Sequence, residues 1–195
     1  MGTILPRAFF DGPTAEIARG LLGAWIVSDL VPGARRALMI TETEAYDGPR
    51  DRASHAHRGI TLRNRPMFGP PGAFYIYFVY GMHWMVNVVT GPEHYPAAVL
   101  LRAGIPEERA AGRDIMPATI KGPALLARHL GITGRMNGLP AEKKNGLWFE
   151  SRAALPGYEH SKIAASRRVG VEYAGPLWSA RKYNFTLLPP RRPGA

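Results

Sequence analysis

The 195-residue chain contains no cysteine. This excludes disulfides, thiolate nucleophiles and cysteine-ligated zinc sites, and nothing in the sequence points to an oxidising compartment. The same absence excludes the zinc-dependent deaminases that act on nucleobases, because their metal needs cysteine ligands. Any chemistry in this chain must therefore come from carboxylates, histidines, hydroxyls and basic side chains.

Long apolar runs are also missing, and no stretch is long enough to cross a membrane. Residues 1–7 lack the charged-then-apolar layout of a secretory signal. We therefore expect an intracellular protein without a membrane partner, in the cytoplasm or nucleoid if the source is bacterial. Hydrophobic residues make up 46% of the chain, which is enough for one well-buried core.

Acidic residues are few, since 15 Asp and Glu stand against 25 Lys and Arg, for a formal net charge of +10. An excess of positive charge of this size is typical of a protein that binds a polyanion. The alternative is a basic surface that only keeps the protein soluble. Five arginines crowd into one predicted loop and its exit, residues 47–65, and this clustering favours phosphate contacts. They are Arg50, Arg52, Arg58, Arg63 and Arg65.

Hydrophobic periodicity, together with the positions of glycine and proline, predicts one α+β domain. Three helices are predicted, over residues 11–23, 106–112 and 122–131, the first of them capped by Asp11 or Thr14. Strands are predicted over residues 25–30, 37–45, 74–79, 82–90, 97–103, 147–150, 163–171 and 184–188.

Several catalytic motifs are absent, including a glycine-rich phosphate cradle, a Gly-x-Ser-x-Gly elbow and a His-Glu-x-x-His helix. His55 and His57 could place two imidazoles on one side of an extended segment, as a metal-dependent hydrolase would need. A metal requires further ligands, and the sequence offers no compelling third. Loop histidines that only make hydrogen bonds are the simpler interpretation, and no metal or cofactor is expected.

One carboxylate stands out as a candidate general base. In the predicted strand 37–45 the side chains of Glu42, Glu44 and Tyr46 share one face. A glutamate on a strand is usually a solvated outward charge. Here the neighbouring aromatic rings would partly desolvate Glu44 and make it a better proton acceptor. Glu42 is the rival, because it lies on the same face.

The aromatic strand 74–79 and the turn after it suggest a surface for a flat ligand. Tyr75 and Tyr77 share one face, and a ring wall against which a base stacks is one interpretation. A strand buried on both sides is the other, although each buried tyrosine hydroxyl would then need a partner. Tyr80 and Gly81 lie where the chain reverses. An aromatic at a hairpin tip resembles the wedges that kink DNA, whereas a ring folded back on its own hairpin is the common alternative.

Taken together, these segments resemble the alkyladenine (3-methyladenine) DNA glycosylases of the mammalian type. The matching sequence motifs occur in the same order along nearly the whole chain. Together they are specific for this family, although each motif alone is weak evidence for it. They lie at residues 42–46, His55, residues 63–68 and 71–82, Asn87, and residues 99–103, 122–123, 130–132 and 168–171. The resemblance implies a catalytic domain over residues 1–188 with a curved antiparallel sheet, a protruding β-hairpin and surrounding helices. The basic, proline-rich residues 189–195 would form a disordered tail.

The resemblance also implies a role for each matching residue. Glu44 would activate the attacking water, which Arg102 and the carbonyl of Val169 would help to hold. Asn87 would crowd the amine of normal guanine, and Tyr80 would fill the place that the base leaves. Tyr46 would stack on one face of the extruded base, with His55 and Tyr77 on the other. The weaker phosphate contacts would be Arg63, Arg65 and Lys121.

The implied activity is that of a monofunctional, monomeric glycosylase acting on double-stranded DNA that contains damaged purines. It would flip an alkylated or deaminated purine from the duplex, hydrolyse the N-glycosidic bond and leave an abasic site. No amine nucleophile lies at the matching positions, so strand cleavage through a Schiff base is not expected. A non-catalytic binder of damaged or bent nucleic acid is the alternative, and it would need Tyr80 and the arginines without Glu44.

Overall fold

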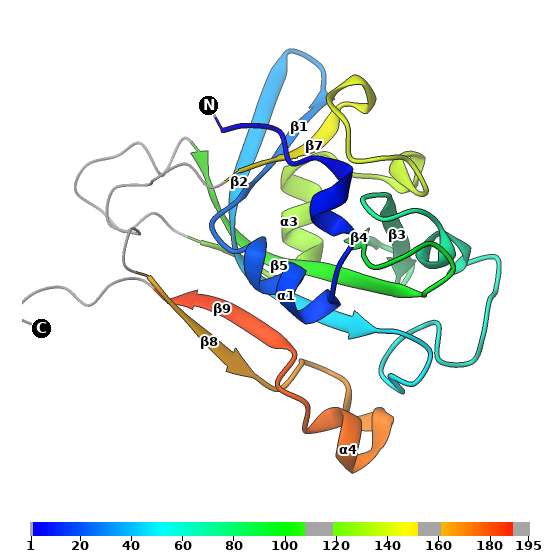
Figure 1. The fold of residues 1–195 in the computed structure, drawn as a ribbon. Coiled ribbons are helices and arrows are strands. Elements are labelled where there is room, and N and C mark those ends of the chain that lie inside the picture. The colour runs from blue at the N-terminus through cyan, green and yellow to red at the C-terminus, as the bar shows by residue number, and fades with distance from the viewer. Residues whose placement is uncertain (1, 108–118, 152–160, 189–195) are drawn as a thin grey trace, which may run out of the picture.

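The computed structural model describes residues 2–107, 119–151 and 161–188 (Figure 1). In these residues the chain forms one α+β domain, as predicted, with a nine-stranded antiparallel sheet and three α-helices. None of these helices combines the length and the apolar character that a bilayer crossing requires.

The strands are β1 (Trp25–Val31), β2 (Ala34–Asp47), β3 (Phe74–Val79), β4 (His83–Val89), β5 (Ala97–Pro106), β6 (Ile120–Lys121), β7 (Leu147–Glu150), β8 (Lys162–Ser166) and β9 (Asn184–Leu188). The α-helices are α1 (Thr14–Gly20), α3 (Pro123–His129) and α4 (Gly175–Ser179), and the 3-10 helices are η1 (Arg7–Phe10), η2 (Arg65–Phe68), η3 (Gly134–Met136), η4 (Lys143–Asn145) and η5 (Glu172–Ala174).

Strand β2 is the axis of the sheet, whose main order is β3-β4-β5-β2-β1-β7. The first part of β2 pairs with β1, while its later residues Glu42, Thr43 and Glu44 pair with β9. Strand β5 runs along the other side of β2, and the pairing is irregular around Glu42. The hairpin of β8 and β9 carries α4 beyond its end, away from α1 and α3 (Figure 1). Two carboxylates in mid-sheet are thus flanked by strands from distant parts of the chain.

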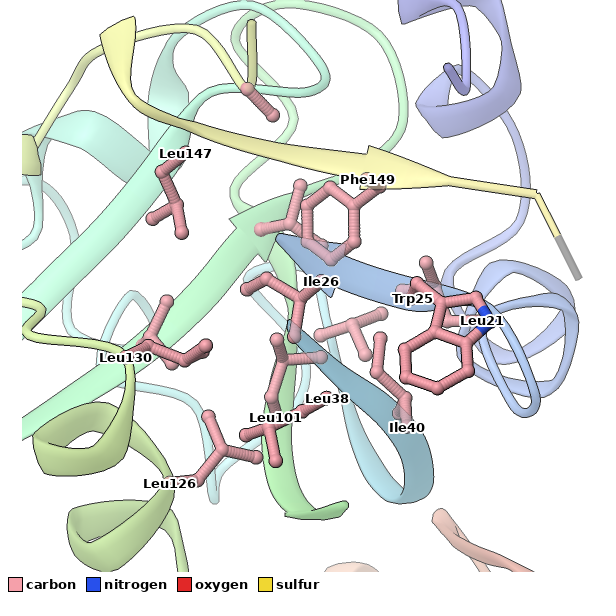
Figure 2. Packing of buried hydrophobic residues seen from close by; sticks show 14 of the residues in the cluster. Leu21, Trp25, Ile26, Leu38, Ile40, Leu101, Leu126, Leu130, Leu147 and Phe149 are labelled. Atoms are coloured by element: carbon pink, nitrogen blue, oxygen red, sulfur yellow. The ribbon is translucent and has the colours of Figure 1, made fainter. Parts of the chain in front are cut away.

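The hydrophobic core lies between the sheet and its helices, with α1 packed on β2 and β5 and α3 on β4 and β5. Figure 2 shows side chains of β1, β2, β5 and β7 meeting those of the two helices. Ile26, Leu38, Leu101, Leu126 and Leu130 are fully buried. Each such side chain contributes roughly 1.5–3 kcal/mol through burial of its apolar surface. This core holds the central strands, and hence the two glutamates, in a fixed frame.

Several sequence predictions need correction. The first helix has no side-chain cap, because Thr14 is its first residue and its hydroxyl donates to Asp47 instead. The strand predicted over residues 163–171 ends at Ser166, and the chain then leaves the sheet. Of the helix predicted over 106–112, Pro106 belongs to β5 and the rest lies almost wholly outside the described residues, as does the tail 189–195.

Candidate active site

A cavity of about 330 Å³ opens between β2, β3 and β5 and the loops that follow β2 and β8. Its volume lies at the lower end of the range for small-molecule sites. Tyr173, on η5, lines the same cavity although the sequence analysis did not select it. Seven of the predicted site residues line it, namely Tyr46, His55, Tyr77, Tyr80, Asn87, Arg102 and Val169.

Glu44 is not part of the cavity wall. Its side chain is 0% exposed and lies behind Tyr46 and Arg102, both of which do line the cavity. Four donors surround the carboxylate. Oε1 accepts hydrogen bonds from the Val169 backbone N–H (2.8 Å) and Asn184 Nδ2 (3.1 Å), and Oε2 from the Tyr46 hydroxyl (2.9 Å) and Arg102 Nη1 (3.3 Å).

This arrangement gives the two oxygens of Glu44 different surroundings. Oε1 is anchored by donors from beyond the C-terminal end of β8 and from β9. Both donors to Oε2, Tyr46 and Arg102, belong to residues that line the cavity, whereas only one donor to Oε1, Val169, does, so Oε2 is the oxygen better placed to meet a water from the cavity. A carboxylate accepts hydrogen bonds at both oxygens, and the four donors supply two to each. Burial and the neighbouring Glu44 carboxylate raise the pKa of the Tyr46 hydroxyl well above its ordinary value, so Tyr46 keeps the proton that it donates.

Glu42 lies beside Glu44 and shares two of its partners. Its Oε1 accepts hydrogen bonds from Arg102 Nε (2.9 Å) and from Asn184 Nδ2 (2.7 Å). Its side chain is 23% exposed and has no hydrogen bond to Tyr46 or to Val169 among the described contacts. Glu42 therefore supports the arginine and the amide, whereas Glu44 also bonds the cavity-lining Tyr46 and Val169.

Aromatic rings form two walls of the cavity. The Tyr46 ring carries the Arg168 guanidinium 4.8 Å from its centroid. The Tyr77 ring packs edge-on against His55, with ring centroids 4.7 Å apart, and lies at a tilt against Tyr75, with centroids 5.2 Å apart. His55 Nδ1 lies 2.9 Å from the Tyr75 hydroxyl, which supplies the partner that a buried phenol requires.

The charge state of these walls follows from burial. Burial raises the pKa of Tyr77 to about 12, so its hydroxyl stays protonated near neutral pH. Burial, followed by the positive charge of Arg63, lowers the pKa of His55. His55 is therefore a neutral ring at pH 7, and the walls beside Tyr77 offer π-faces and hydrogen bonds without a charged imidazolium.

Tyr80 is 88% exposed at the tip of the β3–β4 hairpin and lines the mouth of the cavity. It does not fold back on its own hairpin. Tyr80 has φ 52° and Gly81 has φ 67°, the consecutive left-handed conformations of a type I′ turn. A tyrosine rarely adopts this conformation, so the turn holds the ring outward under local strain.

Asn87, in β4, is buried, and its Nδ2 donates to the Tyr75 carbonyl at 2.9 Å. This bond fixes the orientation of the amide at the cavity wall. Of the predicted phosphate contacts, Arg63 lies over the Tyr77 ring (5.1 Å) and reaches the Phe78 carbonyl (3.4 Å). Arg65 and Lys121 are exposed.

A buried ion pair between Arg168 and Asp51 lies next to the cavity-lining Tyr46. Arg168 Nη2 donates to Asp51 Oδ1 at 2.9 Å, Arg168 Nη1 bonds the other Asp51 oxygen, and both side chains are 0% exposed. The same guanidinium donates to the Ala45 carbonyl at 2.9 Å and packs on Tyr46. The ion pair thus fixes Arg168. The next residue, Val169, is held in place with it, and the N–H of Val169 donates to Glu44.

Asn184 and Asp51 were not predicted as site residues, because no local sequence signal marks either one. Asn184 resembles any polar residue that begins a strand, and Asp51 lies in a segment without periodicity. The histidines of the same loop make ordinary hydrogen bonds, His57 Nδ1 to the Pro49 carbonyl at 3.4 Å. Within the described part of the chain, no three His, Asp or Glu side chains group closely enough to hold a metal ion.

A buried carboxylate behind a cavity with aromatic walls, on a basic chain with an exposed ring at the cavity mouth, is the kind of site a DNA glycosylase needs. Residues 8–188 match the family model described as methylpurine-DNA glycosylase (MPG). The chain therefore belongs to the methylpurine-DNA glycosylase family, and it is an enzyme of DNA repair, a hydrolase whose substrate is DNA. The predicted family is confirmed at this level, while the mammalian subtype stays a prediction.

Several relatives are similar to this chain over nearly its whole length. The chain is 42% identical to a protein of Methanocella arvoryzae, over 98% of each chain. It is 44% identical to one of Anaeromyxobacter dehalogenans strain 2CP-C, over 94% of this chain and 83% of the relative. A Myxococcus xanthus protein is 41% identical, over 93% and 88% respectively. Each of the three is named "Putative 3-methyladenine DNA glycosylase".

Proposed function

We propose that this chain acts as a monomer that flips alkylated or deaminated purines, 3-methyladenine among them, out of duplex DNA and hydrolyses the N-glycosidic bond. Its catalytic domain would be residues 1–188, and the product would be an abasic site. The observation that carries the proposal is the position of Glu44, whose Oε2 lies directly behind an aromatic cavity between two cavity-lining donors.

Extrusion of the base comes first. Tyr80 would enter the duplex from the minor groove and occupy the place of the flipped nucleotide. Its ring is already exposed at the hairpin tip, so the protein needs no conformational change to present it to DNA. Flipping costs a few kcal/mol and is easiest where the base is damaged or mispaired, so part of the selectivity precedes the chemistry.

The flipped purine would then lie between Tyr46 on one face and Tyr77 with His55 on the other. Stacking on such rings is worth roughly 1–3 kcal/mol for a base. An alkylated purine that carries positive charge gains further attraction from their electron-rich faces. The backbone at His55 would contact the edge of the base, and the fixed amide of Asn87 would crowd the exocyclic amine of normal guanine.

Hydrolysis would use a water held by Arg102 and the Val169 carbonyl at Oε2 of Glu44. In the free protein all four acceptor positions of the carboxylate are occupied, and the Arg102 contact is the longest at 3.3 Å. A water that inserts between Arg102 and Oε2 therefore enters at the longest of the four bonds. The bond from the sugar C1′ to the base nitrogen breaks with its electron pair on the base, and the sugar develops oxocarbenium character.

The negative charge of Glu44 would stabilise this cationic sugar while the carboxylate takes a proton from the attacking water. The water oxygen bonds to C1′, and the proton held by Glu44 returns to solvent or to the departing base. No residue forms a covalent bond to the sugar, so the DNA backbone remains intact. Arg63, Arg65 and Lys121 would contact phosphates and fix the position of the duplex.

The proposal is tested with duplex oligonucleotides that each carry one lesion: 3-methyladenine, 7-methylguanine, hypoxanthine or ethenoadenine. We expect release of at least one free base, strand scission only after alkali treatment, and no change in chelator. Binding without release from any duplex would favour the non-catalytic binder. Scission without alkali would contradict a water nucleophile, and loss of activity in chelator would favour a metal-dependent hydrolase.

Replacement of Tyr80 by alanine separates flipping from chemistry. We expect base release from a duplex to fall by roughly tenfold or more, because the cost of an unfilled stack is about one to several kcal/mol. Release of the same lesion from a duplex with an abasic site opposite it should fall much less, because the lesion then has no base-pairing partner and is easier to flip. Equal losses on both substrates would contradict the wedge role, and unchanged thermal unfolding of the variant is the control for folding.

A further inference from the structure

Among the residues that the structure describes, Asn184 is the one neutral side chain with hydrogen bonds to both carboxylates of the site. It is buried on β9, directly opposite Glu44 in the pairing of β2 with β9. Its Nδ2 donates to Glu42 Oε1 at 2.7 Å and to Glu44 Oε1 at 3.1 Å. Two anionic groups therefore meet at the two hydrogens of a single nitrogen.

The orientation of this amide is fixed from its other end. Asn184 Oδ1 accepts hydrogen bonds from the Ser166 hydroxyl on β8 (3.3 Å) and the Thr186 hydroxyl on β9 (3.4 Å). Because the oxygen faces two hydroxyl donors, the amino group must face the carboxylates. Rotating the amide would break four hydrogen bonds in a buried place.

The charges around Asn184 explain why such a donor is needed. Glu42 and Glu44 bring two negative charges to neighbouring positions, and Arg102 is the cation that bonds both. Two neighbouring carboxylates repel each other, and a donor that bonds both offsets this repulsion. Among the described residues, the titratable and charged groups that face the pair are Tyr46 from β2, Tyr77 from β3, Arg102 from β5, Arg168 from the loop after β8 and Tyr173 from η5.

We infer that Asn184 is a positioning residue, which keeps Glu42 and Glu44 ionised together and holds Oε1 of Glu44 so that Oε2 alone is presented to the water. The inference rests on the proposed function of Glu44. Nothing in the local sequence assigns this role, because it arises only where β9 docks on β2. Asn184 acts through the carboxylates and touches no reacting atom itself.

The test is the pH dependence of single-turnover base release in Asn184→Leu, which keeps the shape of the side chain and removes the donor. A hydrogen bond to a charged group is worth enough that its loss should lower the rate at pH 7 roughly tenfold to hundredfold. The acidic limb of the profile should move to higher pH by about one to two units. Asn184→Asp, which adds a third carboxylate, should move it further, whereas Asn184→Ser, which keeps a short donor, should move it less.

Asn145→Leu is the matched control. Asn145, in η4, also donates through Nδ2 to an oxygen, the Pro140 carbonyl at 2.9 Å, but this bond is exposed and involves neither glutamate. Its profile should superimpose on that of the parent. A rate for Asn184→Leu that falls by the same factor at every pH would show a merely structural role, and an unshifted limb would overturn the inference.

A second measurement needs no variant and covers the case in which the Asn184 substitutions fail to fold. In nuclear magnetic resonance spectra of the parent, the chemical shifts of the Asn184 side-chain amide protons should change with pH. The midpoint of this change should equal the midpoint of the acidic limb of the activity profile. An amide signal that ignores pH would overturn the inference. If the parent releases no base from any lesion duplex, the proposed function fails, and the amide titration still decides whether Asn184 governs the ionisation of the carboxylate pair.

Discussion

Replacement of Glu44 by glutamine is expected to slow base release by roughly 10²–10⁴-fold, the range typical of a lost general base. The variant keeps the size of the side chain and should still bind lesion-containing duplexes, because Glu44 lies behind the cavity and not in its wall. Single-turnover release at saturating enzyme measures the chemical step, and a fluorescence titration measures binding.

The geometry also predicts how the glutamine would sit. Val169 N–H, Asn184 Nδ2 and Arg102 Nη1 can only donate, whereas the Tyr46 hydroxyl can accept. The new amino group must therefore point toward Tyr46, and it meets Arg102 as an unfavourable donor. Thermal unfolding of the variant belongs beside the kinetics, since this mismatch reduces stability without abolishing the fold.

Glu42→Gln is the matched control, because Glu42 shares Arg102 and Asn184 but lacks the contacts with Tyr46 and Val169. Its rate should fall by less than that of Glu44→Gln. A larger loss for Glu42→Gln would reverse the assignment of the base. Full activity in both variants would mean that no carboxylate of this pair activates the water.

Replacement of Asp51 by asparagine should lower the free energy of unfolding by about 3–5 kcal/mol, because it leaves the fully buried Arg168 guanidinium without a counter-charge. For a chain of this size the midpoint of thermal unfolding should fall by roughly 6–20 °C. Base release should weaken as well, since Arg168 packs on Tyr46 and precedes Val169. Urea unfolding followed by circular dichroism measures the change.

An exposed ion pair provides the comparison. Glu142 and Lys144 form a surface pair with side chains 48% and 76% exposed, and Glu142→Gln should change stability by no more than about 1 kcal/mol. A similar small change for Asp51→Asn would show that water reaches Arg168. Pairing Asp51→Asn with Arg168→Met should recover part of the loss, because the uncompensated charge is removed.

Much of the fold follows from local sequence signals. The strand predicted over 25–30 differs from β1 by one residue, and those over 74–79, 147–150 and 184–188 match β3, β7 and β9. In these segments β-branched and aromatic residues lie between turn residues, so local preference and tertiary pairing agree. The two-residue strand β6 was not predicted, because so short a segment carries no periodicity.

The end of β8 shows where local signals fail. Residues 163–171 contain enough Val, Ile and Ala to predict a longer strand. Instead the chain turns away after Ser166 so that Arg168 can reach Asp51 and the Val169 N–H can reach Glu44. These bonds join residues more than 100 positions apart in the sequence, and no window of a dozen residues contains them. Asn184 was missed for the same reason.

The candidate site divides along the same line. Residues grouped near one another in sequence, such as Tyr75, Tyr77 and Tyr80, could be selected because alternation and turn position show how they face. The burial of Glu44 and its four donors could not be selected this way, because three of those donors come from other strands or loops. The sequence suggested a carboxylate at the surface of a pocket, and the structure places it one layer deeper.

The bonds that span from Glu44 to Val169 and Asn184 cross 125 and 140 residues. During synthesis the carboxylate leaves the ribosome long before either of these donors has been made, so Oε1 of Glu44 waits without them while Tyr46 and Arg102 can already reach Oε2. Closing such distant contacts is slow. The hydrogen bonds around Glu44 are therefore completed only when the β8–β9 hairpin docks on β2, so a nascent chain reaches the arrangement proposed for hydrolysis only after β9 has formed.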